Sequence, residues 1–271
     1  FKISKVIFEG PNDDLNKTEN TQPAIFLVSY CIFEVIKRES NFDLLKAKYF
    51  AGHSLGEYSA LSTSSAINFE TTIKLLKIRG KSMQSAVPKG SGGMIAILGS
   101  EINYIKKLIE SNKSNYECFI ANDNSNGQIV ISGKNNDLDL FVEDLKKNSI
   151  KNVRLPVSAP FHCKLMKQAT NIMSDEIEKV RLTKPLVPIV SNVTGKPEEE
   201  PVKVKNLLIQ QIESPVRWRE SVLYMINNGV KKFIEIGPGK VLSGLIKRID
   251  RSVGIVSVND LSDFKNIDLN D

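Results

Sequence analysis

The stretch Ala51-Gly52-His53-Ser54-Leu55-Gly56-Glu57-Tyr58 decides how this sequence folds. Residues 48–51 are predicted to end a β-strand, and residues 55–63 are predicted to form a helix. The G-x-S-x-G pattern between them is typical of a sharp strand-to-helix elbow that leaves its serine exposed at the tip. Ser54 is therefore a candidate nucleophile, and the N–H of Leu55 is a candidate donor to an oxyanion. The alternative is a glycine-flanked turn whose serine has no chemical role, because this short pattern also occurs by chance.

The composition is that of a globular chain. It has 271 residues, 41% of them hydrophobic, which is enough for one large domain or for a large and a small one. No apolar run reaches the roughly 18 residues that suggest a membrane-spanning helix. We therefore expect no membrane partner.

The net charge limits the classes of partner to be expected, and the cysteines indicate the redox compartment. A net charge of +6 indicates either a solvated, lysine-rich surface or an acidic macromolecular partner. Nucleic acid is not indicated, because no basic stretch is interleaved with aromatic residues. Cys31, Cys118 and Cys163 show neither C-x-x-C nor zinc spacing, which favours reduced thiols in the cytoplasm. Two separated histidines support no metal site.

The order of predicted elements indicates an α/β fold with a largely parallel sheet. Helices are expected over 21–38, with Thr21 as its cap, and over 68–86. Later in the chain the pattern predicts helices over 161–180, 203–211, 217–228 and 240–249, and strands over 187–191 and 231–236.

A different pattern lies in the middle of the chain, after a glycine-rich link. Residues 94–157 follow the order β-α-β-β-α-β, which is typical of a ferredoxin-like unit. Its strands are expected over 94–98, 118–121, 128–132 and 152–157, and its helices over 101–111 and 135–147. We therefore predict a ferredoxin-like α+β domain at 89–160, inserted into a larger α/β-hydrolase-like domain of residues 1–88 and 161–271.

A serine hydroxyl needs a base before it attacks, and histidine is the usual one. His53 is adjacent to Ser54, where neighbouring side chains point in different directions. His162 is the better candidate, since it follows the junction of the two predicted domains, where pockets are common. No acid stands out as a third member, and over a third of the chain follows His162, unlike a standard hydrolase triad. The sequence favours a Ser-His dyad, with a structural histidine at a helix start as the alternative.

Arg79 is unusual for its helix. It lies four residues after Leu75 and four before Met83, on a face with apolar neighbours. A buried arginine needs an anionic partner. The alternatives are a side chain that reaches out to solvent or an internal salt bridge. The adjacent Gly80-Lys81-Ser82 is not the end of a P-loop, because it lies in mid-helix and the required upstream glycine is absent.

Together these residues resemble the malonyl-CoA:acyl carrier protein transacylases over nearly the whole chain. The motifs that carry the resemblance are Leu15-Asn16-Lys17-Thr18, Thr21-Gln22-Pro23-Ala24, the elbow, Arg79-Gly80 with Met83-Gln84, Gln128-Ile129-Val130-Ile131-Ser132-Gly133, Phe161-His162, Pro215-Val216-Arg217-Trp218 and Glu235-Ile236-Gly237-Pro238-Gly239-Lys240-Val241-Leu242. The family also has an N-terminal strand ending in G-Q-G-S-Q, whose first glutamine helps form the oxyanion pocket, and this sequence begins after that point.

The resemblance implies roles for individual residues. Ser54 would carry the malonyl group, His162 would be the base, and the main-chain carbonyl of Gln211 would orient that base. The residues implied to contact the substrate are Leu55, Arg79, Met83, Gln128 and Phe161. Arg79 would pair with the free malonyl carboxylate, and Phe161 would crowd an α-methyl branch.

The expected partners are malonyl-CoA and acyl carrier protein, and the chain is expected to be a monomer without cofactor or metal. Carrier proteins of this kind are acidic, so their docking surface should be basic. The candidate docking residues are Lys151, Arg154, Lys247 and Arg248. Two other functions stay open, a serine esterase or thioesterase with water as acceptor, and a non-catalytic acyl-binding module.

Overall fold

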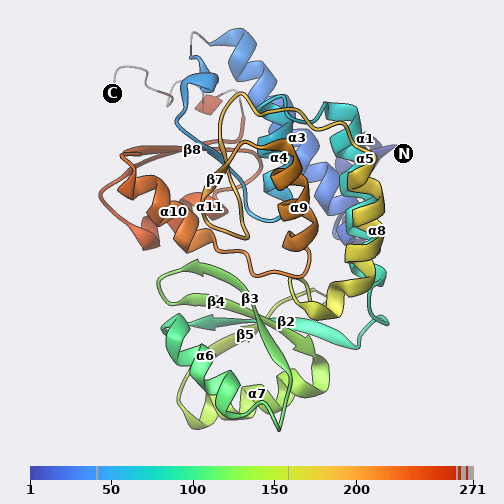
Figure 1. Ribbon diagram of the computed structural model, residues 1–271, viewed down its shortest axis with the longest axis vertical. Coiled ribbons are helices and arrows are strands. Elements are labelled where there is room, and N and C mark those ends of the chain that lie inside the picture. The colour runs from blue at the N-terminus through green and yellow to red at the C-terminus, as the bar shows by residue number, and fades with distance from the viewer. Residues whose placement is uncertain (41, 158, 261, 264–266, 268–271) are drawn as a thin grey trace.

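The elbow strand lies in a small sheet of the computed structural model (Figure 1). That strand, β1 (Phe50–Ala51), pairs in parallel with β6 (Ile189–Val190), which pairs antiparallel with β7 (Pro197–Glu198). A second sheet joins β8 (Lys232–Ile236) in parallel to β9 (Gly254–Val258). The structure describes residues 1–40, 42–157, 159–260, 262–263 and 267. Within these residues the fold is mixed α/β, and the parallel pairs belong to two separate sheets.

Helices surround these two sheets, as Figure 1 shows. Their described bounds are α1 (Ile3–Glu9), α2 (Asn12–Leu15), α3 (Thr18–Glu39), α4 (Leu55–Thr63), α5 (Phe69–Ser85), α8 (Lys167–Glu178), α9 (Pro201–Gln211), α10 (Trp218–Asn227) and α11 (Val241–Ile249), with 3-10 turns at Leu44–Lys46 and Lys164–Met166. One hydrophobic core joins α3, α4, α5, α8 and α9, and contains the fully buried Phe26, Leu61 and Leu76. A second core joins α10 and α11 to the strands around Val190.

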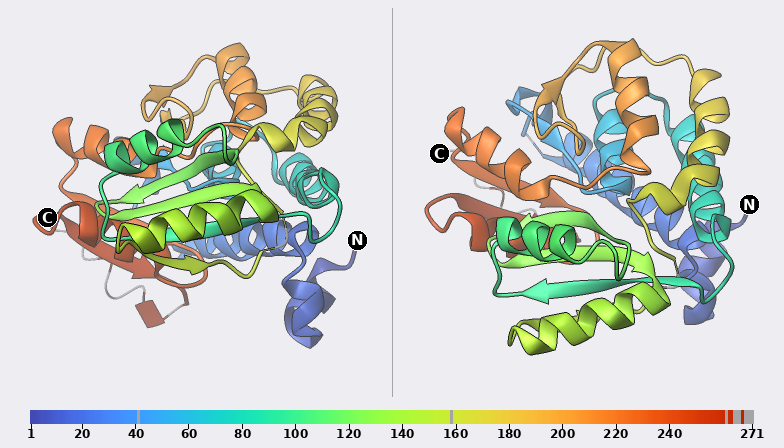
Figure 2. Two further views of the ribbon diagram at one scale, coloured as in Figure 1. Left: turned by 90° about the horizontal axis from the view of Figure 1, so that it is seen from below. Right: turned by 60° about the horizontal axis from the view of Figure 1, so that its bottom comes forward.

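A four-stranded antiparallel sheet follows the glycine-rich link. Its strands are β2 (Gly92–Leu98), β3 (Cys118–Ser125), β4 (Gln128–Lys134) and β5 (Lys151–Arg154), in the order β3-β4-β2-β5. The helices α6 (Ile102–Ser111) and α7 (Asn135–Lys147) cover the face turned away from the rest of the chain (Figure 2).

Alternation along the strands gives this sheet two buried faces. Ile95 and Ile97 face the helices, where they pack with Ile105 and Phe141. Met94, Ala96 and Val130 face the other way, where Phe161 packs against them. The sheet therefore contacts the residue that precedes His162.

Two predicted helix starts are wrong. α3 begins at Thr18, not at Thr21, so Pro23 lies inside the helix, which tolerates the loss of one backbone donor there. The helix expected from residue 161 begins at Lys167, after the 3-10 turn. His162 has φ 58°, a left-handed value that no helical residue adopts. Phe161 and His162 are therefore in a loop.

Several elements have no counterpart in the sequence pattern. These are α1, α2, β7 and β9. The cysteines Cys31, Cys118 and Cys163 are all free. Among the described residues, no helix is both long and apolar enough to cross a membrane.

Candidate functional site

The elbow holds Ser54 in an uncommon backbone conformation. Its φ is 54° and its ψ is −110°, between β1 and the first residue of α4. Gly52 permits the turn, because a Cβ there would lie 2.0 Å from the carbonyl group of Gly56. Leu55 opens α4, so its N–H belongs to the first-turn donors that have no intrahelical acceptor. The turn thus presents a hydroxyl beside the first N–H of the helix, that of Leu55.

His162 lies beside this hydroxyl. Its Nε2 is 2.8 Å from Ser54 Oγ, and its Nδ1 is 2.9 Å from the main-chain oxygen of Gln211. A carbonyl oxygen only accepts hydrogen bonds, so Nδ1 carries the proton and Nε2 is free to accept from the serine. The dyad geometry expected from the sequence is therefore present, with the carbonyl of Gln211 where a triad would have an acid.

The surroundings keep His162 neutral. Burial lowers the pKa of His162 to about 3, and the positive charge of Arg79 acts in the same direction. A neutral imidazole is the form that can take a proton from a hydroxyl. The site is thus ready to act as a base at neutral pH.

Arg79 lies on the other side of the serine and is 1% exposed. Its Nη2 donates to Ser54 Oγ at 3.2 Å and to Gln211 Oε1 at 2.8 Å, and its Nη1 donates to Gln22 Oε1 at 2.7 Å. The Tyr58 ring lies 5.5 Å from the guanidinium carbon. The Nε of Arg79 forms no hydrogen bond within the described part of the chain. A buried cation with only neutral oxygen acceptors and a spare donor is suited to an anionic ligand.

Gly80 brings α3 close enough for this contact. A Cβ on Gly80 would lie 2.5 Å from the carbonyl oxygen of Thr18. The close approach of the two helices places Gln22 against Arg79. The amide of Gln22 also donates to Met83 Sδ at 3.9 Å, so Met83 lies in the core, one turn beyond Arg79.

Two residues of the site, Asn192 and Glu57, and the side chain of Gln211 have no role in the sequence prediction. Asn192 accepts from the N–H of Ser54 at 2.6 Å and donates to the carbonyl of Gly52 at 2.8 Å. Gln211 also acts through its side chain, which donates to the carbonyl of Ser54 at 3.1 Å. Glu57, 2% exposed, accepts from both Asn192 and Gln211. The glutamate in the first turn of the elbow helix was the one signal that could have identified this group.

Two further predicted substrate contacts, Phe161 and Gln128, differ in where they lie. Phe161 adjoins His162, and its carbonyl accepts from the Ser132 hydroxyl at 2.5 Å. Gln128 opens β4 and accepts from Arg248. No hydrogen bond joins Gln128 to Ser54 or Arg79 within the described residues.

The predicted docking residues lie on two different elements. Lys247 and Arg248 are exposed in the last turn of α11. Lys151 and Arg154 are exposed on β5, the strand at the opposite edge of the sheet from β3. Arg154 is paired with Asp139 at 2.5 Å, so its charge is partly compensated.

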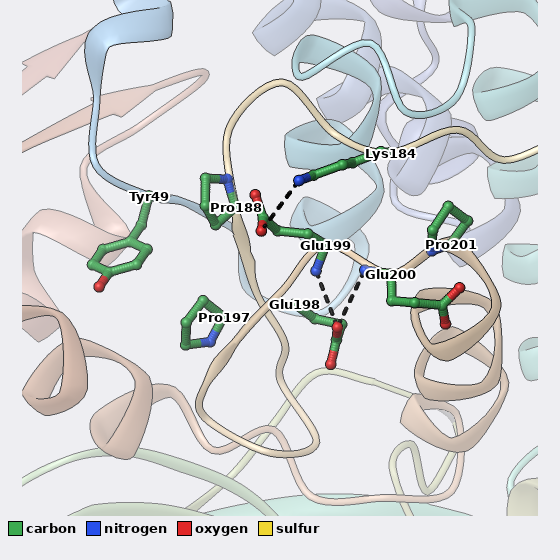
Figure 3. Close-up of a pocket in the computed structure, with 8 residues that line it drawn as sticks. All are labelled: Tyr49, Lys184, Pro188, Pro197, Glu198, Glu199, Glu200 and Pro201. Carbon is green, nitrogen blue, oxygen red and sulfur yellow. Dashed lines mark hydrogen bonds and ion pairs between the residues drawn. The ribbon is translucent and has the colours of Figure 1, made fainter.

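A cavity of about 480 Å³ lies away from the dyad (Figure 3). It is lined by Tyr49, Lys184, Pro188, Pro197, Glu198, Glu199, Glu200 and Pro201. Glu198 pairs with Lys203, Glu199 pairs with Lys184, and Glu200 accepts from the first N–H groups of α9. Each carboxylate already has a structural partner, so we assign no ligand to this cavity. Across the described residues, no group of three His, Cys, Asp or Glu side chains could hold a metal ion.

Comparisons with known proteins agree on one family. The family "Acyl transferase domain" matches residues 1–263. The malonyl CoA-acyl carrier protein transacylase of Haemophilus influenzae is 39% identical over 269 residues, covering 99% of this chain and 86% of that protein. Its counterpart in Escherichia coli K12 is 40% identical, covering 94% of this chain and 82% of that protein.

Solved structures give the same result. An acyl-carrier-protein S-malonyltransferase from Bartonella henselae superposes with a TM-score of 0.94 at 41% identity, covering 98% of this chain and 85% of that one. A malonyl-transacylase in complex with its type II PKS acyl-carrier protein superposes with a TM-score of 0.93 at 36% identity, covering 98% of this chain and 85% of that one.

Proposed function

Because this chain belongs to the acyl transferase family, among the malonyl CoA-acyl carrier protein transacylases, we propose that it transfers malonyl groups from malonyl-CoA to acyl carrier protein. The reaction proceeds through an acyl-serine and belongs to fatty acid biosynthesis. The observation that carries the proposal is the convergence of Ser54, His162 and a buried Arg79 on one hydroxyl oxygen.

In the first half-reaction, Ser54 Oγ attacks the thioester carbonyl while His162 Nε2 takes the hydroxyl proton. The carbonyl of Gln211 stabilises the resulting imidazolium through Nδ1–H. The N–H of Leu55 donates to the oxyanion. The C–S bond then breaks, and His162 returns the proton to the coenzyme A sulfur, which leaves as the thiol.

In the second half-reaction the phosphopantetheine thiol of the carrier replaces coenzyme A. His162 takes the thiol proton, the sulfur attacks the acyl-serine, and the proton returns to Ser54 Oγ as the C–O bond breaks. His162 therefore acts as the base in both half-reactions.

Arg79 selects the acyl group. Its guanidinium binds the free carboxylate of malonyl through charge-assisted hydrogen bonds, with the Nε–H, which has no hydrogen-bond partner among the described residues, as one available donor. An acetyl group has no carboxylate and leaves the buried cation without an anion. Phe161, beside the base, restricts branching at the α-carbon, and Met83 supports this side of the pocket through Gln22. Gln128, the first residue of β4, is a further proposed substrate contact.

Intact mass spectrometry tests the proposal directly. After incubation with malonyl-CoA, we expect one added malonyl group on the wild-type protein and none on Ser54→Ala. Addition of carrier protein should move the group to the carrier thiol. Release of free malonate without a thiol acceptor would instead identify a thioesterase, and labelling of neither serine nor carrier would identify a non-catalytic acyl-binding module.

The proposal extends to the domain organisation. The βαββαβ order and the sheet order β3-β4-β2-β5 support a ferredoxin-like domain at residues 89–160. The elbow between β1 and α4 supports an α/β-hydrolase-like larger domain of residues 1–88 and 161–271. We also propose that the chain acts as a monomer in the cytoplasm, where free cysteines such as these stay reduced.

A further inference from the structure

We propose that Glu57 is a positioning residue, which holds the side chain of Gln211 and the main chain of Asn192 and through them positions Arg79 and Ser54. The inference rests on the function proposed above and adds a residue that touches neither substrate nor reacting atoms.

The contacts of Glu57 converge on one oxygen. Its Oε2 accepts from Gln211 Nε2 at 2.7 Å and from the main-chain N–H of Asn192 at 3.1 Å. Glu57 lies in the first turn of α4, Asn192 follows β6, and Gln211 ends α9. The carboxylate thus joins three separate elements directly beneath the elbow.

The carboxylate fixes which way the Gln211 amide points. A glutamine amide can flip by about 180°, which exchanges the positions of its oxygen and nitrogen. Its hydrogen-bond partners decide which of the two orientations it adopts. On one side the carbonyl of Ser54 can only accept, and Glu57 Oε2 already accepts from the N–H of Asn192, so Nε2 lies there. Oε1 then faces Arg79 and accepts from its Nη2 at 2.8 Å. Without Glu57, Arg79 would lose the constraint that aims it at the serine.

The same oxygen also holds the turn. By accepting from the N–H of Asn192, it anchors the residue whose side chain bonds the N–H of Ser54 and the carbonyl of Gly52. Gly52 and Ser54 therefore both depend on a single acceptor, which lies three residues after the serine. The main-chain oxygen of Gln211 accepts from His162 Nδ1, so Glu57 also influences the position of the base through Gln211.

Electrostatics support this placement. The direct hydrogen-bond acceptors of Arg79 are neutral, and its positive charge favours the ionised form of Glu57 one amide away. Burial acts against that form and is the larger effect, which raises the pKa of Glu57 to about 7. A buried carboxyl that accepts hydrogen bonds from two neighbours is expected to orient them.

The test compares Glu57→Gln with Glu57→Ala in the full chain. Glutamine keeps an oxygen acceptor at the Oε2 position, whereas alanine removes it. Glu57→Asp, which withdraws the carboxylate by one methylene, replaces Glu57→Ala where that variant does not fold. Glu198→Ala is the matched control, because one oxygen of Glu198 likewise accepts from two N–H groups, but Glu198 lines the cavity away from the dyad.

Two readouts separate positioning from simple stability. One is the rate at which a fluorophosphonate labels Ser54, and the other is the ratio of malonyl to acetyl loading. In folded Glu57→Ala both should fall by at least about tenfold, because small displacements of reacting groups have large kinetic effects. Glu57→Gln should stay within roughly threefold of the wild type, and Glu198→Ala should change neither quantity.

The outcomes are distinguishable. Wild-type labelling rate and loading ratio in folded Glu57→Ala would overturn the proposal, as would an equal loss in Glu57→Gln. If the wild type takes no malonyl group, the proposed function fails, but the labelling rates still test the role of Glu57.

Discussion

Arg219 donates three hydrogen bonds, of 2.8, 3.0 and 3.1 Å, to the carboxylate of Asp123, and so links helix α10 to strand β3. Two backbone bonds flank the pair, from the N–H of Asp123 to Val216 and from the N–H of Val216 to Ala121. The next residue of β3, Asn124, reaches His53 in the elbow at 2.8 Å. The orientation of the four-stranded sheet relative to the nucleophile therefore depends on this ion pair.

Arg219→Ala should destabilise the fold by about 2–4 kcal/mol, because it leaves a buried carboxylate unpaired. Urea unfolding measures the loss. Arg217→Ala is the matched control, since Arg217 pairs with Glu220 on the same helix but is 47% exposed, and it should change stability by less than about 1 kcal/mol. Equal losses in the two variants would show that the pair with Asp123 has no special weight.

The serine and histidine are expected to act as one unit. Ser54→Ala and His162→Ala should each remove most malonyl transfer, and the double variant should be little worse than either. Single-turnover kinetics on the three variants give the comparison. Losses that add in free energy would argue that the two residues work independently.

Arg79 should govern the choice between acyl groups. Removing one member of a desolvated charge pair typically costs about 2–5 kcal/mol, so Arg79→Ala should lower malonyl transfer by roughly a hundredfold or more. Acetyl transfer should hold or rise. Arg79→Lys should restore only part of the activity, because lysine lacks the planar fork. A parallel fall of malonyl and acetyl transfer would exclude the carboxylate role.

The basic end of α11 should serve the carrier protein. Reversing Lys247 and Arg248 to glutamate should slow transfer to the carrier, and the effect should shrink with added salt, because exposed charges are screened over about 8 Å at physiological ionic strength. Loading of Ser54 from malonyl-CoA should change much less. Stopped-flow measurement of the two half-reactions separates these effects.

Lys106 and Lys107 provide the control for that experiment. They are adjacent and exposed like the first pair, but lie on α6, on the outer face of the four-stranded sheet. Reversing them should leave both half-reactions unchanged. Equal loss in the two half-reactions for the α11 variant, or no salt dependence of the carrier step, would place the docking surface elsewhere.

The pH dependence of stability should expose Glu57. The pKa of this carboxyl in the folded protein is about 7, above its ordinary 4.5, so the folded state binds the proton more tightly than the unfolded state. The resulting stabilisation is complete below pH 4.5 and is lost as the pH rises through 7. Relative to Glu57→Gln, the wild type should therefore weaken between pH 5 and 8, by up to about 3 kcal/mol.

Denaturant unfolding at several pH values gives this difference. His162 contributes with the opposite sign, because its lowered pKa stabilises the fold above pH 6.5 and is lost toward pH 3, but it is present in both proteins and cancels. Arg79 is the charged group facing Glu57, and it reduces the size of the effect. A difference that does not change with pH would mean that Glu57 stays in one protonation state.

The sequence predicted the parts of the site that carry a recognisable chemical type. A serine between glycines, a histidine at a junction and an arginine among apolar residues each stand out by residue and spacing. Asn192, Gln22 and the side chain of Gln211 do not, because an uncharged amide gains its role only from what the fold places beside it. The loop at Phe161 and His162 was missed for a related reason, since a left-handed histidine leaves no trace in hydrophobic periodicity.

The backbone of Ser54 sets stability and activity against each other. At φ 54° a side chain is strained, and such residues persist only because their surroundings hold them, typically against about 1–3 kcal/mol. The conformation suits glycine, which has no side chain and therefore no nucleophile. Selection for stability alone would therefore favour glycine at position 54, which would inactivate the enzyme. Selection for turnover keeps the serine hydroxyl there.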